Sequence, residues 1–218
     1  MQRQNKTVSV IMAVYNTPIE LVMRAINSVL NQDLLPLELI VIDDGSDADF
    51  GKHILHYRQF QPVKIRYHWH ANCGQSQSIN KGVRMSEGNY IAIIDSDDEY
   101  KPNHISACLH EMYNADLICS LTETIVDKYE DYFVPHKDNH RESIHVDDCI
   151  LFATLFGRKE VFNLLSFKNM YAADADFYEQ AALHFRIKKV NLRTYIYYRN
   201  IHNSISAKLK QQQLSLMQ

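Results

Sequence analysis

Apolar residues in this chain form short continuous runs separated by stretches with helical spacing. Continuous apolar runs bounded by turn residues are typical of buried strands. These runs predict strands over residues 8–14, 37–42, 64–67, 90–95 and 116–126. Between the runs, apolar residues recur every three or four positions and would share one side of a helix. This spacing predicts helices over residues 18–30, 75–85 and 102–112.

The alternation of strands and helices in the first half predicts an α/β fold. Successive strand–helix–strand units give a mostly parallel central sheet with helices on both faces. The second half is less regular, and we expect it to form a smaller mixed lobe. The expected division places the regular half at residues 7–115, the irregular half at 116–206 and a tail at 207–218. The tail is either a frayed helix or the start of a longer protein.

Within the second half, the polar stretch Tyr129–Asp148 has no periodicity and contains Pro135. It predicts a loop that covers the functional site, since irregular connections of this kind carry function. Further elements are expected on either side of a helical stretch at 174–185. These are strands at 152–156, 187–192 and 195–198, and a short helix after Arg158.

One helix start carries a specific signal. Thr17-Pro18-Ile19-Glu20 has a threonine followed three residues later by glutamate, which is the pattern of a capping box. Proline is also favoured at the first position of a helix. We therefore expect Thr17 to cap a helix that begins at Pro18.

Composition and charge narrow the function classes. The chain has 218 residues with a formal net charge of −3, which suits one domain and argues against a nucleic-acid-binding surface. The four cysteines are scattered without a Cys-x-x-Cys pair, so we expect ordinary thiols in a reducing compartment and no zinc site. No apolar stretch reaches 18 residues, and residues 1–6 are too polar for a signal peptide.

Clustered carboxylates are the main chemical signal. Asp95, Asp97 and Asp98 follow directly on a buried apolar run, where open α/β sheets bind ligands. Neighbouring carboxylates repel one another and burial adds to that cost, so a divalent cation is the simplest compensation. Mg²⁺ or Mn²⁺ is commonly held by one or two carboxylates together with substrate phosphates. The sequence therefore predicts a metal–phosphate site at the end of this strand.

Two other acidic pairs leave alternatives open. Asp43-Asp44-Gly45-Ser46 follows a predicted strand and would open at the same sheet edge, but these residue types also form ordinary turns. Asp174 and Asp176 lie at the start of a predicted helix, where the helix dipole alone favours carboxylates.

In their order along residues 7–206, these segments resemble family 2 inverting glycosyltransferases with the GT-A fold. Asp95-x-Asp97 matches the Asp-x-Asp signature of that family. The other matching segments are residues 8–16, 25–32, 38–46, 72–91 and 198–206. The order of the motifs carries the resemblance more than any single match.

The resemblance implies that residues 7–115 form a nucleotide-sugar-binding half and residues 116–206 an acceptor and catalytic-base half. It also implies a role for each matching residue. Asp97, Asp95 and His202 would bind Mn²⁺ or Mg²⁺, which would bridge the diphosphate of a UDP-sugar. The nucleotide-sugar would contact Ala13, Tyr15, Asn16, Asp43, Asp44, Asn80, Asp95, Ser96 and Arg199. His202 has an equally acceptable interpretation as a histidine of a surface loop.

The resemblance also implies a catalytic base at the start of a helix. An inverting transfer needs a group that takes the proton of the acceptor hydroxyl. Asp174 aligns best with that base, and Asp176 is the alternate. The chain departs from the family pattern at Ala173, where glutamate is usual, and at Glu179-Gln180, near which an arginine is often found.

We therefore expect a metal-dependent inverting glycosyltransferase that moves a sugar from a UDP-sugar to a hydroxyl of a glycan or lipid-linked acceptor. A cytoplasmic enzyme, peripheral to the membrane that carries its acceptor and active in bacterial cell-surface polysaccharide synthesis, fits the absence of a membrane segment. Two alternatives stay open. One is a non-catalytic nucleotide-sugar-binding lobe of a larger synthase, and the other is a phosphoryl-transfer enzyme that uses the Asp-x-Asp motif.

Overall fold

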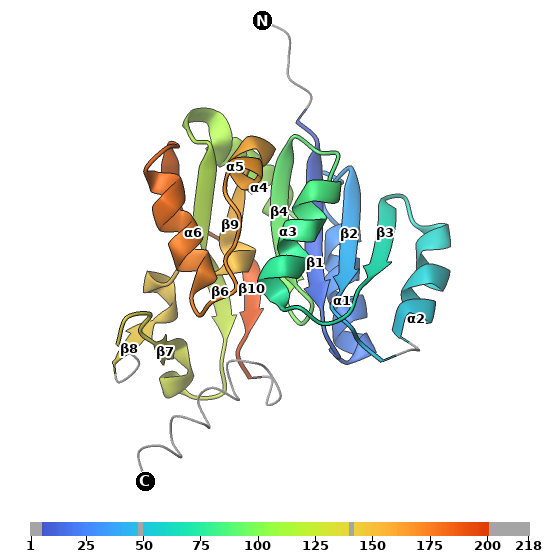
Figure 1. Ribbon diagram of the computed structural model, residues 1–218, viewed down its shortest axis with the longest axis horizontal. Helices are drawn as coiled ribbons and strands as arrows, with labels where there is room; N and C mark the ends of the chain where they lie inside the picture. Colours follow the sequence, from blue (N-terminus) through green and yellow to red (C-terminus); the bar gives the residue numbers. More distant parts are fainter. Residues whose placement is uncertain (1–5, 48–49, 140–141, 201–218) are drawn as a thin grey trace, which may run out of the picture.

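A computed structural model shows one large central sheet with helices on both faces (Figure 1). It describes residues 6–47, 50–139 and 142–200. The sheet has eight strands in the order β3-β2-β1-β4-β9-β6-β10-β5. The α/β class and the mostly parallel sheet expected from the sequence are confirmed.

The strands of the central sheet are β1 (Val8–Val14), β2 (Glu38–Asp43), β3 (Lys64–Trp69), β4 (Tyr90–Asp95), β5 (Glu99–Tyr100), β6 (Leu117–Ile125), β9 (Leu155–Arg158) and β10 (Ile187–Tyr198). A small second sheet pairs β7 (Phe133–Pro135) with β8 (Ser143–His145). The helices are α1 (Ile19–Leu30), α2 (Phe50–Tyr57), α3 (Gln75–Met85), α4 (His104–Glu111), α5 (Lys159–Leu164) and α6 (Ala173–Ala182). None of the helices in the described ranges is both long and apolar enough to cross a bilayer.

The first half of the chain forms the parallel part of the sheet. β1 lies between β2 and β4, and β2 pairs with β3, all in parallel register. The second half extends the same sheet, because β9 inserts antiparallel between β4 and β6, and β10 pairs parallel with β6. All four parallel strands β1–β4 therefore end at one edge of the sheet.

Two apolar layers hold the helices against the sheet. Successive side chains of a strand point to opposite faces, so Val10 and Ile11 of β1 enter different layers. One layer contains the buried residues of α1 and α4, and the other contains those of α3 and α6. The sheet is thus buried on both faces, which explains why its strands appear as continuous apolar runs in the sequence.

The expected capping box is wrong. α1 begins at Ile19, with Pro18 as the residue before the first turn, and no side chain caps it. The hydroxyl of Thr17 instead lies 2.7 Å from the hydroxyl of Ser96. The hydroxyl that was expected to cap the helix thus contacts a residue 79 positions away in the sequence.

The second half differs from the sequence prediction in three places. Tyr129–Asp148 is not a plain loop, since it contains the β7–β8 hairpin between 3₁₀ turns. The expected strand at 152–156 begins with a 3₁₀ turn, and β9 starts at Leu155. The two expected strands at 187–198 form one strand, β10, with an irregular register between Val190 and Tyr195. Arg193 lies inside that irregularity and has φ of 47°, which is not a strand conformation. The strand therefore continues because it pairs with β6 on both sides of Arg193, and the local sequence does not predict this.

Close packing of α3 on β1 gives a first prediction. A Cβ added at Gly82 would lie 2.5 Å from Cγ2 of Ile11. Alanine normally favours a helix over glycine by about 1 kcal/mol, but overpacking a core costs about 1–3 kcal/mol. We expect Gly82→Ala to lower the free energy of unfolding by roughly 1 kcal/mol, measured by urea denaturation.

Arg84→Ala is the matched control on the same helix, because Arg84 is exposed. Its free energy of unfolding should stay within about 0.5 kcal/mol of the parent protein. A Gly82→Ala protein more stable than the parent would contradict the close approach of α3 and β1.

Candidate active site

The carboxyl ends of the parallel strands bring the predicted site residues into one row. Strand register pairs Ala13 with Asp95, Val14 with Asp43 and Asp43 with Trp69. Adjacent strands lie about 4.8 Å apart. Residues separated by more than 80 positions in the sequence thus stand side by side at the sheet edge where α/β folds bind ligands.

Asp98 has a different environment from the two carboxylates before it. Its Oδ2 accepts a hydrogen bond of 2.7 Å from the hydroxyl of Tyr195, and its Oδ1 accepts one of 2.8 Å from the backbone N–H of Tyr198. The Tyr195 hydroxyl also accepts the backbone N–H of Asp95 at 3.1 Å. Asp98 therefore anchors the turn formed by residues 95–98, called the acidic turn below, to β10, and both of its carboxylate oxygens are used in that contact.

Asp95 and Asp97 are the carboxylates left to bind a ligand. Desolvation raises the pKa of Asp95 to about 7, with further contributions from the charges of Asp97 and Asp174. Desolvation also raises the pKa of Asp97, opposed in part by Arg24. Within the described residues, no lysine or arginine side chain forms an ion pair with either carboxylate. The site thus concentrates negative charge that a cation would neutralise.

α6 places Asp174 near this charge cluster. Oδ2 of Asp174 accepts the N–H of Phe152 at 3.2 Å, and Oδ1 accepts that of Ala175 at 2.9 Å. Desolvation nevertheless raises the pKa of Asp174 to about 6. Asp176 lies two residues further along the helix and forms an ion pair with Lys168 at 2.9 Å. The two candidate bases therefore differ, since of the two only Asp174 has a charge that raises the pKa of Asp95.

The backbone before Asp174 is strained. Ala172 has φ of 53° and ψ of 38°, the left-handed region that residues with a Cβ rarely adopt. Such a conformation costs of order 1–3 kcal/mol and persists where the surroundings enforce it, often at functional sites. Ala172 thus strengthens the case for α6 as a functional helix, and nothing in the sequence signals it.

Asp43 and Asp44 are engaged within the protein. Asp43 accepts the N–H of Ser46 at 2.7 Å and the hydroxyl of Tyr67 at 2.5 Å. Asp44 accepts the backbone N–H groups of Cys73 and Gly74, at 2.8 and 2.9 Å. The turn interpretation of this motif therefore describes its contacts well, and each carboxylate also borders the shared sheet edge.

The other residues expected to contact a nucleotide fall into two groups. Tyr15 is 55% exposed just beyond β1, and Asn16 beside it has φ of 49° and donates its N–H to the hydroxyl of Ser46. Ser96, described above with Thr17, is buried in the acidic turn. These residues lie at or next to the carboxyl edge.

Asn80 and Arg199 make contacts that the sequence did not predict. The buried amide of Asn80 donates to the carbonyl of Phe167 and accepts its N–H, at 2.8 and 3.0 Å. Arg199 donates to the carbonyl oxygens of Asp131 and Phe133, at 2.5 and 3.4 Å, and so ties the end of β10 to the hairpin region. His202, the third expected metal ligand, lies outside the described residues.

Three residues that shape the site were missed in the sequence. Gln75 donates a hydrogen bond of 2.8 Å to Oδ1 of Asp95. Arg24 donates to the backbone carbonyl of Asp97 and lies 3.8 Å from the ring centroid of Tyr198. Tyr195 holds Asp98. All three contact the acidic turn from distant segments of the chain, and no local sequence motif predicts such contacts.

The mostly parallel sheet with acidic strand ends has the architecture of the GT-A fold class. The chain belongs to glycosyl transferase family 2, whose sequence pattern matches residues 9–186. Family membership leaves the phosphoryl-transfer alternative without support.

Chondroitin synthase of Escherichia coli is 33% identical over 104 residues, which are 48% of this chain and 15% of that protein. The chain spans less than half the length of the curated relatives it matches.

Solved structures agree on the fold. S. aureus TarS 1–349 in complex with UDP-GlcNAc has a TM-score of 0.71 at 20% identity, over 93% of this chain and 60% of that one. A mannosyltransferase from Pyrobaculum calidifontis, in complex with GDP-Man and Mn²⁺, has a TM-score of 0.69 at 14% identity. That match covers 89% of this chain and 57% of the mannosyltransferase.

The Tyr195–Asp98 contact gives a second prediction. Tyr195→Phe removes the hydroxyl and leaves a buried carboxyl group short of one donor, at a cost of about 1–3 kcal/mol. We expect that loss in the free energy of unfolding, measured by chemical denaturation. Tyr113→Phe, at an 86% exposed residue, is the matched control and should have no measurable effect. Equal stability of the two variants would show that the hydroxyl does not support the acidic turn.

Proposed function

We propose that this chain is a metal-dependent inverting glycosyltransferase that transfers a sugar from a UDP-sugar to a hydroxyl group. The observation that carries the proposal is the arrangement of Asp95, Asp97 and Asp174 around one edge of the sheet. Ion pairs within the described residues do not balance their charges, and desolvation together with the charges of Asp97 and Asp174 raises the pKa of Asp95. This arrangement suits a site completed by a cation and a diphosphate.

The donor set fits a hard divalent cation. Oxygen ligands suit Mg²⁺ and Mn²⁺, and Asp95 and Asp97 offer carboxylate oxygens, while Asp98 is already used by β10. When bound, the ion would neutralise the negative charge that develops on the departing diphosphate. The Mn²⁺ present in the structurally similar mannosyltransferase is consistent with this choice.

The nucleoside would lie over the ends of β1 and β2. Tyr15 offers an exposed aromatic ring there, and the half-buried Ala13 lies beside Asp95 in the strand register. Asp43 and Asp44 fix the turn that borders the ends of these strands. UDP is the proposed nucleotide because the structurally similar TarS binds UDP-GlcNAc. The sugar is left open.

Asp174 is the proposed base. It would take the proton of the acceptor hydroxyl while the hydroxyl oxygen forms a bond to the anomeric carbon. The bond from that carbon to the diphosphate breaks, and its electrons leave with UDP. Asp176 is the weaker candidate because Lys168 engages it.

The acceptor is proposed to be a glycan or a lipid-linked sugar. Its support is the similarity to chondroitin synthase, whose name describes the synthesis of a polysaccharide. The described hairpin β7–β8 and α6 form the side of the molecule that faces away from β3 (Figure 1). We propose that this side binds the acceptor.

Calorimetric titration of UDP tests the donor site. Wild-type protein should bind UDP in the presence of Mn²⁺, and EDTA should weaken binding at least tenfold. Asp97→Asn keeps the side-chain shape and removes the charge, so it should abolish the dependence on Mn²⁺. Asp33→Asn, at an exposed carboxylate distant in sequence, should behave as wild type. Equal UDP binding with Mn²⁺ and with EDTA would overturn the metal-dependent site.

The pH dependence of turnover tests the base. The pKa of Asp174 is raised to about 6, so the carboxylate is charged above that pH and protonated below it. A base acts only when deprotonated, so kcat/KM should rise with pH through about 6 and then level off. Asp174→Asn should lower kcat by at least about 100-fold and still bind UDP, whereas Asp176→Asn should keep the profile.

These assays also distinguish the non-catalytic alternative. A nucleotide-sugar-binding lobe without a base would bind UDP but show no turnover, and Asp174→Asn would change nothing. Turnover that is insensitive to both substitutions would place the base elsewhere.

A further inference from the structure

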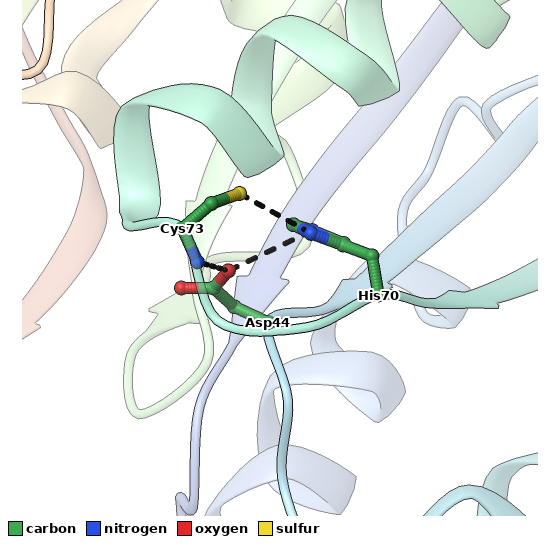
Figure 2. A group of neighbouring side chains, drawn as sticks. All are labelled: Asp44, His70 and Cys73. Carbon is green, nitrogen blue, oxygen red and sulfur yellow. Dashed lines mark hydrogen bonds and ion pairs between the residues drawn. The ribbon is translucent and has the colours of Figure 1, made fainter.

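Three side chains with different metal-binding atoms meet beside the start of α3. Asp44 follows β2, His70 follows β3, and Cys73 lies in the loop that leads to α3 (Figure 2). One donor atom from each residue lies within 4.8 Å of the other two. The Cys73 sulfur is 3.2 Å from Nδ1 of His70, and Nε2 of His70 is 3.7 Å from Oδ1 of Asp44. Asp44 also borders the proposed nucleoside position, but none of the three residues belongs to the Asp95–Asp97 pair.

Backbone geometry brings the three residues together. The N–H of His70 bonds to the carbonyl of Asp43 at 3.0 Å and so continues the pairing of β2 with β3. The loop then passes over Gly45, where a Cβ would lie 2.8 Å from the N atom of Asn72. Gly45 also has φ of 90°, so glycine is required at this crossing. The approach of the loop to Asp44 is therefore part of the fold.

Neighbouring groups orient two of the donor side chains. Asp44 is held by the N–H groups of Cys73 and Gly74, which leave lone pairs on its oxygens. Nε2 of His70 lies 3.0 Å from the hydroxyl of Ser78, which itself donates to the carbonyl of Gly74. Nδ1 of His70 lies 3.0 Å from the carbonyl oxygen of Ala71, so each ring nitrogen has an outer partner, and either nitrogen can bind a metal while the other donates its proton. Such outer contacts are typical of metal-ligating histidines and carboxylates.

The donor chemistry selects the metal. Sulfur, imidazole nitrogen and carboxylate oxygen together suit Zn²⁺, whereas Mg²⁺ and Mn²⁺ prefer oxygen. Tetrahedral ligands with bonds of about 2.0–2.3 Å stand about 3.5 Å apart. With a single ring nitrogen of His70 as the ligand, the three donor atoms lie within 4.8 Å of one another, and rotation of the exposed Cys73 side chain can bring them to this spacing.

We propose that Asp44, His70 and Cys73 form a zinc site with three protein ligands and an open fourth position for water. The site is distinct from the carboxylate pair Asp95–Asp97 in its ligands and in the metal it selects. It goes beyond the proposed transferase activity and needs neither a nucleotide nor turnover.

Bound zinc would join the ends of β2 and β3 to the first turn of α3. Gly74 precedes that turn, and Gln75 within it donates to Asp95. The ion would therefore hold the loop that positions one neighbour of the acidic turn. Because an ion that binds only the folded protein stabilises it, zinc should raise the melting temperature of the protein.

Cobalt spectroscopy and zinc calorimetry test the proposal. Co²⁺ bound to a thiolate gives a near-ultraviolet charge-transfer band, and one equivalent of Zn²⁺ should displace it in wild-type protein. Cys73→Ser should lose the band and at least tenfold in zinc affinity, and His70→Ala should lose at least tenfold in zinc affinity. Cys149→Ser, at a half-buried thiol elsewhere in the chain, is the matched control and should keep both signals.

The outcomes separate this site from the proposed donor site. Asp97→Asn should bind zinc as wild type does, and zinc should raise the melting temperature of both proteins but not that of Cys73→Ser. A cobalt–thiolate band retained in Cys73→Ser, or no zinc binding by folded wild-type protein, would overturn the zinc site. Failure of UDP to bind would leave it intact.

Discussion

The cost of holding negative charge at the carboxyl edge of the sheet shapes the whole functional region. The fold answers part of this cost with hydrogen bonds. Asp43, Asp44 and Asp98 each accept two or more hydrogen bonds from backbone or tyrosine groups. Desolvation nevertheless raises the pKa values of Asp95, Asp98 and Asp174, although each of them accepts hydrogen bonds. Hydrogen bonds thus orient the carboxylates of this edge but do not remove the cost of burying their charge.

The sequence separation of these contacts explains which parts of the candidate site could be predicted. The acidic runs and the strand ends are local features, so pattern and resemblance singled out Asp95, Asp97 and Asp174, whose charges the structure brings near one another. The anchoring role of Asp98 depends on Tyr195, 97 residues away, and no local pattern announces that contact. His70 and Cys73 are three residues apart, a spacing compatible with zinc, but a search for paired cysteines alone overlooked them.

The same contrast holds for the fold. β1, β2, β4 and α3 are close to their predicted limits, because burial on both faces leaves continuous apolar runs in the strands and a one-sided stripe on the helix. β7 and β8 have no continuous apolar run, since every residue of these two strands is half-buried or exposed. Tertiary contacts from Arg199 to this region replace the periodicity that the sequence lacks. The continuous β10 likewise depends on pairing with β6 and passes through a left-handed Arg193.

α3 connects the parts of the site in a way that follows from this architecture. Its first turn reaches Asp95 through Gln75, and further along the helix the buried amide of Asn80 holds the backbone of Phe167. The ring of Phe167 stacks on that of Phe177 in α6, with centroids 4.2 Å apart. One helix thus contacts the acidic turn directly and shares a buried apolar cluster with the helix of Asp174. Since a close-packed core transmits strain, a displacement of α3 would be felt both at the acidic turn and at the proposed base.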